Sequence, residues 1–380
     1  MARWPRPGHG CHPGHAHRGH EARNTGVTSW SHDKAEPFVL ALFAHVARND
    51  APKPEWVQAW TERALRLGSA EATFLAFIET PGHQKRIEDD RDARTRWPAG
   101  HAYSPIPSRR ELERDAPRLF APRALPGVDL RAEEQLRLLA ALAPFFATIP
   151  FPDTHTPPFR YFFKNSGYGF GDALIYWAML NHLRPARILE IGGGFASALA
   201  LDTIARLNLE TTCTFVTPDP DAAQQAIGPL DPAHRLIKSR AQDLDPAQFE
   251  KLEAGDLLFI NSTHVLKAGS DVHFLLTEAL PRLRPGVFVH FQEIFAPFEY
   301  PRSWVIDRGH GWNEAYALHL FLQYNAEFQI EFFNHYIGTE LAGAVTASGT
   351  PQMDRFLLNP GGGLWLSRRS TAPVDHTVFS

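Results

Sequence analysis

The sequence predicts an α/β protein whose main part is a doubly wound domain, preceded by a small all-α module. From about residue 158 onward, short continuous apolar runs alternate with helical stretches, which is typical of a parallel sheet covered on both faces. One of these runs leads into three consecutive glycines at residues 192–194, and a helix follows. The length of 380 residues exceeds one ordinary globular domain, so roughly two or three units are expected.

Composition excludes several classes of protein. Lys and Arg number 38 against 42 for Asp and Glu, so no strong positive field exists to bind nucleic acid without regard to sequence. The two cysteines, Cys11 and Cys213, are too few for a disulfide framework and fit a reducing compartment. No apolar run is long enough to span a membrane, and the N-terminus lacks the apolar segment of a secretory signal. We therefore expect a soluble cytoplasmic protein without nucleic-acid or membrane partners, of open oligomeric state.

Residues 1–30 are rich in Gly, Pro, His and Arg and contain almost no aliphatic side chains. Such a segment buries too little surface to offset its conformational entropy, so we expect a disordered tail. Metal capture is the alternative, because this segment holds Cys11 and a histidine tract. The histidines of the tract are His9, His12, His15, His17 and His20. Residues 371–380 are expected to form a second tail.

Residues 31–95 predict a small helical module. Phe38 and Leu42 recur at four-residue spacing, as do Trp56 and Trp60, and Ser69 is a plausible N-cap for a further helix. The segment resembles a small helical module of unknown function found in bacterial surface and sugar-related proteins. Residues 96–156 are interpreted as a connector, extended over residues 96–126 because of their Pro and Arg content, with an amphipathic helix over residues 127–146.

The α/β domain is expected over residues 157–370. A helix with apolar positions at core spacing is predicted over residues 271–280. The expected strands cover residues 187–191, 213–217, 235–238, 256–260, 286–291, 328–333 and 363–367.

The stretch RILEIGGGFAS at residues 187–197 carries the most chemical information. Glycines at the carboxyl end of a strand let the backbone approach a ligand, as in dinucleotide-binding enzymes. Here, however, Ser197 replaces the third glycine of the dinucleotide fingerprint, and Glu190 precedes the first glycine by two positions. A carboxylate there would repel a pyrophosphate. It can instead accept hydrogen bonds from a cationic amino-acid group or from the backbone of the glycine loop, so an NAD-dependent oxidoreductase is disfavoured.

The segment ILEIGGGFAS resembles the first motif of class I S-adenosylmethionine-dependent methyltransferases. The resemblance continues through residues 255–301 and 309–334, where it is closest to a bacterial branch associated with polysaccharide and secondary-metabolite genes, and it covers roughly residues 100–370. It implies a Rossmann-like sheet of seven strands with the last strand antiparallel. It also implies S-adenosylmethionine as cofactor.

The resemblance implies positions for the cofactor. The glycine loop and Glu190 would contact its methionine end, and Gln242 and Asp243 would lie at the adenine. At the ribose the superfamily usually has an acidic residue, whereas this chain has Thr217, with Asp219 as a possible substitute. The implied cofactor residues are Glu190, Gly192, Gly193, Gly194, Thr217, Asp219, Gln242, Asp243 and Asn261.

The acceptor side departs from the family pattern. After the fourth strand the branch commonly reads Asp-Ser-Ser-His, and this chain has Asn261-Ser262-Thr263-His264; after the fifth it commonly reads His-x-His-Asp, and this chain has His290-Phe291-Gln292-Glu293. Related metal-assisted O-methyltransferases bind Mg²⁺ with carboxylates at these strand ends. Asn261, Gln292 and Glu293 would be a weak set of ligands, because two of the three are neutral amides. Without a metal, His264, His290 or Glu293 would accept the proton of the acceptor.

Two hypotheses about function follow. The leading one is an S-adenosylmethionine-dependent methyltransferase that acts on an oxygen of a small molecule or glycan hydroxyl. The alternative is a catalytically degenerate, methyltransferase-like binding or scaffold protein, suggested by Thr217, Asn261, Gln292 and Glu293.

Overall fold

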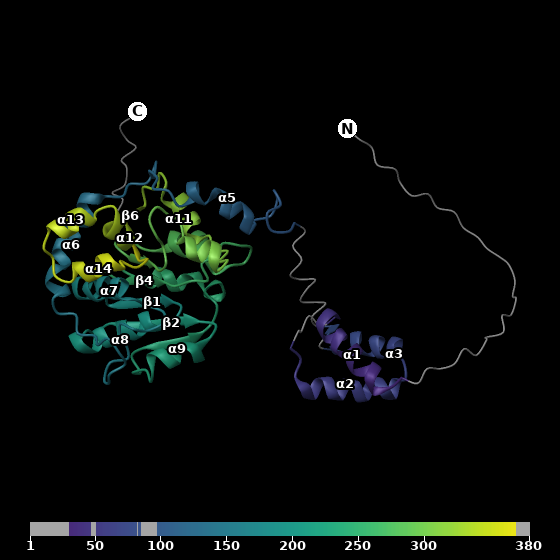
Figure 1. The fold of residues 1–380 in the computed structure, drawn as a ribbon. Coiled ribbons are helices and arrows are strands. Elements are labelled where there is room, and N and C mark those ends of the chain that lie inside the picture. The colour runs from purple at the N-terminus through teal and green to yellow at the C-terminus, as the bar shows by residue number, and fades with distance from the viewer. Residues whose placement is uncertain (1–29, 47–50, 82, 85–96, 370–380) are drawn as a thin grey trace, which may run out of the picture. The chain divides into compact units, whose positions relative to one another are not determined.

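The computed structural model describes residues 30–46, 51–81, 83–84 and 97–369, and it divides into two compact units between Pro98 and Ala99 (Figure 1). Except for Trp30, the two expected tails at residues 1–30 and 371–380 lie outside the described residues, as do Cys11 and the N-terminal histidine tract. Within the described part, no helix is both long and apolar enough to cross a membrane.

The first unit contains the helices α1 (His32–Ala41), η1 (Leu42–Val46, a π-helix), α2 (Pro54–Leu67) and α3 (Ala70–Ile78). Its apolar core includes Val39, Phe43 and Phe77. Ser69 caps α3 as predicted, because its Oγ accepts a hydrogen bond from the backbone N–H of Ala72 at 3.1 Å.

The second unit is built on one seven-stranded sheet with the order β3-β2-β1-β4-β5-β7-β6 (Figure 1). The strands from β1 to β5 pair in parallel, and β7 is antiparallel to both β5 and β6. The predicted fold class is confirmed, including the antiparallel last strand. The strands are β1 (Arg187–Ile191), β2 (Thr212–Thr217), β3 (Arg235–Lys238), β4 (Leu257–Ile260), β5 (Phe288–Phe291), β6 (Phe328–Phe333) and β7 (Leu364–Arg368).

Helices cover both faces of this sheet. Successive β4 residues point to opposite faces, so Phe259 lies in one apolar core with Trp177 and Leu258 lies in the other with Phe249. Burial on both faces explains why the strands read as continuous apolar runs. The first core is covered by α6 (Ala132–Phe146), α7 (Phe170–Leu183), α8 (Phe195–Leu207), α9 (Pro220–Ile227), α12 (Asn334–Thr339), α13 (Ala342–Ala347) and α14 (Met353–Leu358).

The second core is covered by shorter elements. The helix predicted over residues 271–280 forms as α10 followed by η4 and η5, with Val272, Leu275 and Ala279 buried as expected. The covering elements are η2 (Ala241–Asp243), η3 (Pro246–Lys251), α10 (Asp271–Phe274), η4 (Leu275–Ala279), η5 (Leu280–Arg282), η6 (Ser303–Asp307) and α11 (Glu314–Leu322).

The segment before the sheet differs from the extended connector that we expected at residues 96–126. Residues Arg109–Leu119 form helix α5, which begins with a capping box. The backbone N–H of Glu111 donates to Ser108 Oγ at 3.2 Å, and the backbone N–H of Ser108 donates to Glu111 Oε2 at 2.8 Å. This local pairing stabilises a helix despite the Pro and Arg content of the segment. The later helix, α6, begins at Ala132 and belongs to the second unit's core.

Candidate active site

The glycine loop lies between the end of β1 and the start of α8, and its first two glycines, Gly192 and Gly193, have close neighbours. Gly192 has a positive φ of 122°, and a Cβ there would lie 2.7 Å from the backbone oxygen of Asn261. A Cβ at Gly193 would lie 2.7 Å from the Cβ of Ala223. Glycine is therefore required for the loop to pass between the end of β4 and α9.

Glu190 and Ser197 hold this loop together. Glu190 is fully buried, and its Oε1 accepts a hydrogen bond from Ser197 Oγ at 2.5 Å. The same hydroxyl accepts a hydrogen bond from the backbone N–H of Gly194 at 3.0 Å. Ser197 therefore ties the loop to the carboxylate of the strand, which gives a physical role to the residue that replaces the third glycine.

The second carboxylate oxygen of Glu190 is available to a ligand. Oε2 has no hydrogen-bond partner among the described residues, although it is buried. Burial raises the pKa of Glu190 to about 7, and the hydrogen bond from Ser197 offsets only part of that shift. A buried acceptor without a donor is costly, so a ligand that donates a hydrogen bond here would be stabilised.

Thr217 is the last residue of β2 and Asp219 lies just beyond it, at the position expected for the ribose. Thr217 is buried, and its Oγ1 accepts a hydrogen bond from the backbone N–H of Asp219 at 3.2 Å. Asp219 is exposed, and its Oδ1 caps α9 by accepting from the backbone N–H of Ala222 at 3.1 Å. The Asp219 carboxylate therefore has a structural partner at the edge of the loop.

Gln242 and Asp243 lie in η2, and their side chains differ in whether an acceptor atom lacks a hydrogen-bond partner. Both carboxylate oxygens of Asp243 accept hydrogen bonds at 2.7 Å from Arg240, which lowers the pKa of this aspartate. Gln242 donates from Nε2 to the backbone oxygen of Gly269 at 2.9 Å, and its Oε1 is buried with no partner among the described residues. Of the two, Gln242 offers the open acceptor.

His264 follows β4 and lies between two carboxylates. Its Nδ1 is 2.8 Å from Glu314 Oε2, and its Nε2 is 3.1 Å from Glu293 Oε2. The imidazole also packs against the indole of Trp312, with 4.5 Å between ring centroids. His264 and Glu293 both have positive φ values, 60° and 63°, which non-glycine residues adopt rarely and which occur often at functional sites.

The two carboxylates determine the protonation of His264. Burial alone would lower its pKa, but hydrogen bonds and charge interactions with Glu293 and Glu314 outweigh burial and raise the pKa to about 9. Both ring nitrogens therefore carry protons at neutral pH and donate to carboxylates. In this state His264 is an imidazolium between the two carboxylates, which differs from the neutral imidazole that we expected.

Glu314 is a site residue that the sequence reasoning missed. It is 1% exposed at the start of α11, and its Oε1 accepts a hydrogen bond from Ser262 Oγ at 2.8 Å. The backbone N–H groups of Asn313 and Glu314 donate to the carbonyl oxygen of His264 at 3.0 and 3.1 Å. The sequence feature that could have indicated Glu314 is a single acidic residue at the start of an otherwise largely apolar helix, EAYALHLFL.

The position of His290 differs from the one that we expected. We placed it just beyond the fifth strand, but it lies inside β5, is 1% exposed and packs between Phe259 and Trp365, at 4.3 and 4.4 Å between centroids. Burial lowers its pKa to about 3, so the ring is neutral. The reason is register, because His290 pairs with both aromatic residues across the sheet. An acceptor cannot reach it.

The side chain of Gln292 also makes its hydrogen bonds within the protein interior. Its Oε1 lies 3.0 Å from His290 Nε2, and its Nε2 donates to Asp172 Oδ2 at 3.0 Å. Asp172, on α7, also accepts hydrogen bonds from Asn334 and Gly362, both at 3.0 Å. This buried carboxylate, which sequence reasoning missed, joins the ends of β5, β6 and β7. The signal for it was an aspartate in the apolar helix FGDALIYWAML.

The expected metal ligands do not fit Mg²⁺. Gln292 uses both ends of its amide within the protein, and the Glu293 carboxylate faces the protonated His264. The described ranges contain no group of three or more His, Cys, Asp or Glu side chains placed to hold a metal ion. Hard cations such as Mg²⁺ require several oxygen ligands, and the third expected ligand, Asn261, adds only a neutral amide.

A cavity of about 330 Å³ adjoins Glu293. Glu293 has 26% of its side chain exposed, which makes it the accessible member of the His264–Glu293–Glu314 group. Phe295 and Trp304 give the cavity an aromatic wall, and Gly361 and Gly362 line it as well. A Cβ at Gly362 would lie 2.9 Å from Glu293 Cα, so glycine there lets β5 and the start of β7 approach closely.

Comparison with known sequences places part of the chain in a described family. Residues 189–294, from β1 to just past β5, match the family model described as "Methyltransferase domain". An uncharacterized protein from Archaeoglobus fulgidus is 35% identical over 171 residues, which cover 43% of this chain and 77% of that protein.

Solved structures provide more distant similarities. The apo structure of CmcI is 14% identical with a TM-score of 0.34, and the match covers 60% of this chain and 84% of that one. The O-methyltransferase TomG from Streptomyces achromogenes, solved with SAM, is 15% identical with a TM-score of 0.34, covering 68% and 96%. Both TM-scores are below 0.5, so the sequence matches carry the comparison.

Proposed function

Since this chain belongs to the class I S-adenosylmethionine-dependent methyltransferases, we propose that it methylates an oxygen of a small-molecule or glycan acceptor, with Glu293 accepting the proton. The observation that carries this proposal is the partly exposed Glu293 carboxylate, held against the His264 imidazolium at the edge of a cavity of about 330 Å³. A hydroxyl in this cavity can donate a hydrogen bond to Glu293.

The proposed cofactor site is the carboxyl edge of β1, β2 and β4. Glu190 and residues 192–194 would hold the methionine end, and two buried acceptors without donors support this placement, Glu190 Oε2 and Gln242 Oε1. An ammonium group would satisfy the first and an adenine amino group the second. Thr217 and Asp219 would lie at the ribose. Asn261 would border the loop, since its backbone oxygen already lies close to Gly192.

The protein's own task is alignment and removal of a proton. When bound, S-adenosylmethionine supplies an already activated methyl group, so correct orientation of the acceptor accounts for much of the rate enhancement. Glu293 would receive the acceptor proton while His264 and Glu314 hold its carboxylate in place. His264 thus acts as a positioning residue. We propose no catalytic role for His290, because it is enclosed and neutral.

The test uses the full chain, calorimetry with S-adenosylmethionine, and a panel of phenolic, catecholic and sugar hydroxyl acceptors. Glu293→Gln should lower kcat by a factor on the order of 100 while cofactor affinity is unchanged. Glu340→Gln, at an exposed position on the same unit, is the matched control.

Three outcomes would contradict the proposal. Absence of cofactor binding at millimolar concentration would reject the methyltransferase site. Cofactor binding without turnover across the panel would favour the degenerate binding protein instead. Full activity of Glu293→Gln would move the proton acceptor elsewhere.

A further inference from the structure

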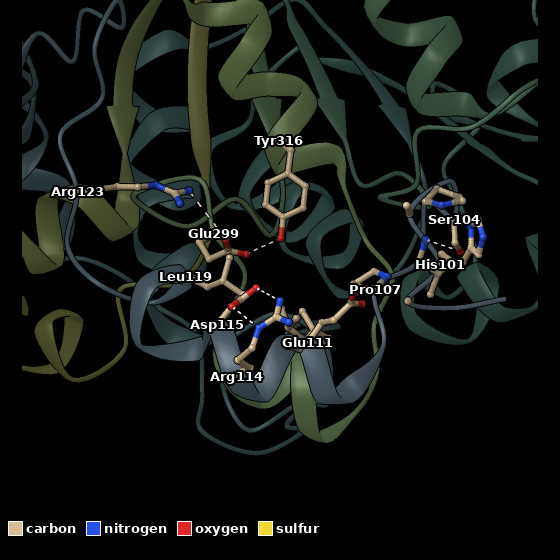
Figure 2. A pocket seen from close by; sticks show the side chains of 16 residues that line it. His101, Ser104, Pro107, Glu111, Arg114, Asp115, Leu119, Arg123, Glu299 and Tyr316 are labelled. Atoms are coloured by element: carbon tan, nitrogen blue, oxygen red, sulfur yellow. Dashed lines mark hydrogen bonds and ion pairs between the residues drawn. The ribbon is translucent and has the colours of Figure 1, made fainter. Parts of the chain in front are cut away.

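A second cavity, of about 540 Å³, lies beside the proposed acceptor cavity and has its own lining. It is bounded by residues 100–107, by α5, and by segments that follow β5 and begin α11 (Figure 2). Glu299 and Val305 line this second cavity, whereas Pro301 and Trp304 line the acceptor cavity. Residues 299–305 therefore form a wall between two separate spaces.

The floor of the second cavity holds a buried carboxylate with an open oxygen. Glu299 is 8% exposed, and its Oε1 accepts hydrogen bonds from Tyr316 Oη at 2.5 Å and from the backbone N–H of Tyr300 at 3.1 Å. Its Oε2 accepts no hydrogen bond from any residue of the described ranges. The nearest cation is Arg123 Nη2, at 3.9 Å. Because Glu299 lines the cavity, a ligand hydroxyl can donate a hydrogen bond to this oxygen.

Arg123 places a donor next to this acceptor. Figure 2 shows the Arg123 guanidinium and the Tyr316 hydroxyl both directed at Glu299. Arg123 donates from Nη2 to the backbone oxygen of Pro297 at 3.2 Å, and its side chain is 37% exposed. A guanidinium has five N–H donors, so the pair presents donors and an acceptor side by side. Neighbouring hydroxyls of a sugar, each able to donate and accept, match that arrangement.

The remaining lining excludes simpler ligands. Asp115 pairs with Arg114 at 2.9 Å, and Glu111 accepts from Ser108, so these charges already have partners. The Glu299 carboxylate would repel a small anion, and the Arg123 guanidinium would repel a small cation. A pure hydrocarbon would leave Glu299 Oε2 without a hydrogen-bond donor. Apolar side chains also line the cavity, among them Ile106, Leu112, Leu119 and Val305.

We propose that this cavity is a carbohydrate-binding site that takes a neutral, pyranose-sized polyol. Its hydroxyls bind Glu299 and Arg123, with the Tyr316 hydroxyl holding the carboxylate, while the C–H faces of the sugar contact the apolar walls. The volume lies within the range of small-molecule sites. Burial of Glu299 raises its pKa, as expected for a carboxylate that lacks solvent. The site is separate from methyl transfer, so the proposal goes beyond the proposed function.

The experiment measures binding of four methyl glycosides, the glucoside, galactoside, mannoside and rhamnoside, by saturation-transfer NMR and calorimetry on the full chain without cofactor. At least one should bind with a millimolar Kd. Glu299→Ala should weaken that binding by about tenfold, and Tyr316→Phe by a smaller factor. Glu299→Gln keeps the side-chain volume and provides a second variant if the alanine variant does not fold. Glu113→Gln, exposed on α5 and outside the cavity, should change nothing.

Each other outcome overturns the proposal. If none of the four glycosides binds, or if binding is equal in wild type and in a folded Glu299 variant, the cavity is not a carbohydrate site. The Glu293→Gln variant separates the two cavities. Loss of glycoside binding in that variant would place the sugar in the acceptor cavity, whereas unchanged binding leaves the two sites independent even if methyl transfer is never found.

Discussion

Replacing Glu314 by glutamine removes one of the two carboxylates that flank the His264 imidazole. Glu314 Oε2 lies 2.8 Å from His264 Nδ1, and Oε1 accepts a hydrogen bond from Ser262 at 2.8 Å. Glu314 and His264 are only 1% and 4% exposed, so water and salt screen their interaction weakly. Glutamine has nearly the same shape and keeps one carbonyl acceptor, so the substitution removes the negative charge and replaces one of the two accepting oxygens by an amide donor.

The magnitude follows from the protonation of His264. Against the opposing effect of burial, Glu293 and Glu314 raise its pKa from 6.5 to about 9, which corresponds to roughly 3 kcal/mol of folding free energy. Because the folded pKa lies above the unfolded one, this contribution is complete below pH 6.5 and is lost as pH rises through 9. Since Glu293 remains, Glu314→Gln should lower the free energy of unfolding by roughly 2 kcal/mol at pH 6 and by much less at pH 9.5.

Urea unfolding, followed by tryptophan fluorescence at pH 6, 7.5 and 9.5, measures this difference. Histidine ring signals in NMR spectra of wild type, Glu314→Gln and His264→Gln assign the pKa directly. Glu113→Gln controls for loss of a surface charge, since Glu113 pairs with Arg109 on the exposed face of α5. Equal destabilisation by Glu314→Gln at all three pH values, or an unchanged pKa of His264, would refute the reasoning.

Three further predictions concern the glycine loop and the Asp172 junction. Gly192→Val places a Cβ near the backbone oxygen of Asn261 at a residue with positive φ. The affinity for the cofactor, measured by calorimetry, should therefore fall more than about tenfold. Gly343→Ala, in open space on α13, is the control and should leave this affinity unchanged. Ser197→Ala removes the hydrogen bond to Glu190, so the pKa of Glu190 should rise further and cofactor affinity should fall by a measurable factor between pH 6 and 8. Asp172→Asn puts an amide donor among the groups that donate to this carboxylate, and should lower the free energy of unfolding at pH 7 by roughly 1–3 kcal/mol.

Each of these has a clear contrary result. Normal cofactor affinity in Gly192→Val would place the cofactor elsewhere. Unchanged affinity in Ser197→Ala would mean that the loop does not depend on the Glu190 carboxylate. A denaturation curve of Asp172→Asn that overlays the wild-type curve would show that the junction of β5, β6 and β7 does not need a negative charge.

Much of the sheet was predictable from the sequence. Buried parallel strands are apolar on both faces, so β1 appears as a short continuous apolar run and has the predicted bounds. The bounds of β3 and β6 were predicted as well, although β3 is a largely exposed edge strand and β6 is antiparallel to β7. The turn after β1 was also predictable, because it depends on local sequence: consecutive glycines at the end of an apolar strand permit a narrow set of backbone paths. Helix α5 was missed although its Ser108–Glu111 capping box is local, because the surrounding prolines and arginines favoured an extended segment.

The chemistry of the site was harder to predict from the sequence. Glu314 and Asp172 meet His264 and Gln292 across 50 and 120 residues of chain, and neither partner can be inferred from sequence spacing. His290 was assigned to the acceptor site although the strand predicted over residues 286–291 already included it; β5 ends at Phe291, and its pairing with β4 and β7 places the imidazole between Phe259 and Trp365. The carboxylates of Asp219 and Asp243 looked available, but one caps α9 and the other pairs with Arg240.

The sequence by itself determined the order of strands and helices, the glycine loop and the family to which the chain belongs, because these depend on local backbone freedom and on the period of apolar residues. Only the tertiary structure decided the charge states of the site. Desolvation and Coulomb interactions depend on distances between residues far apart in the chain, so the same residue type, histidine, is an imidazolium at His264 and neutral at His290.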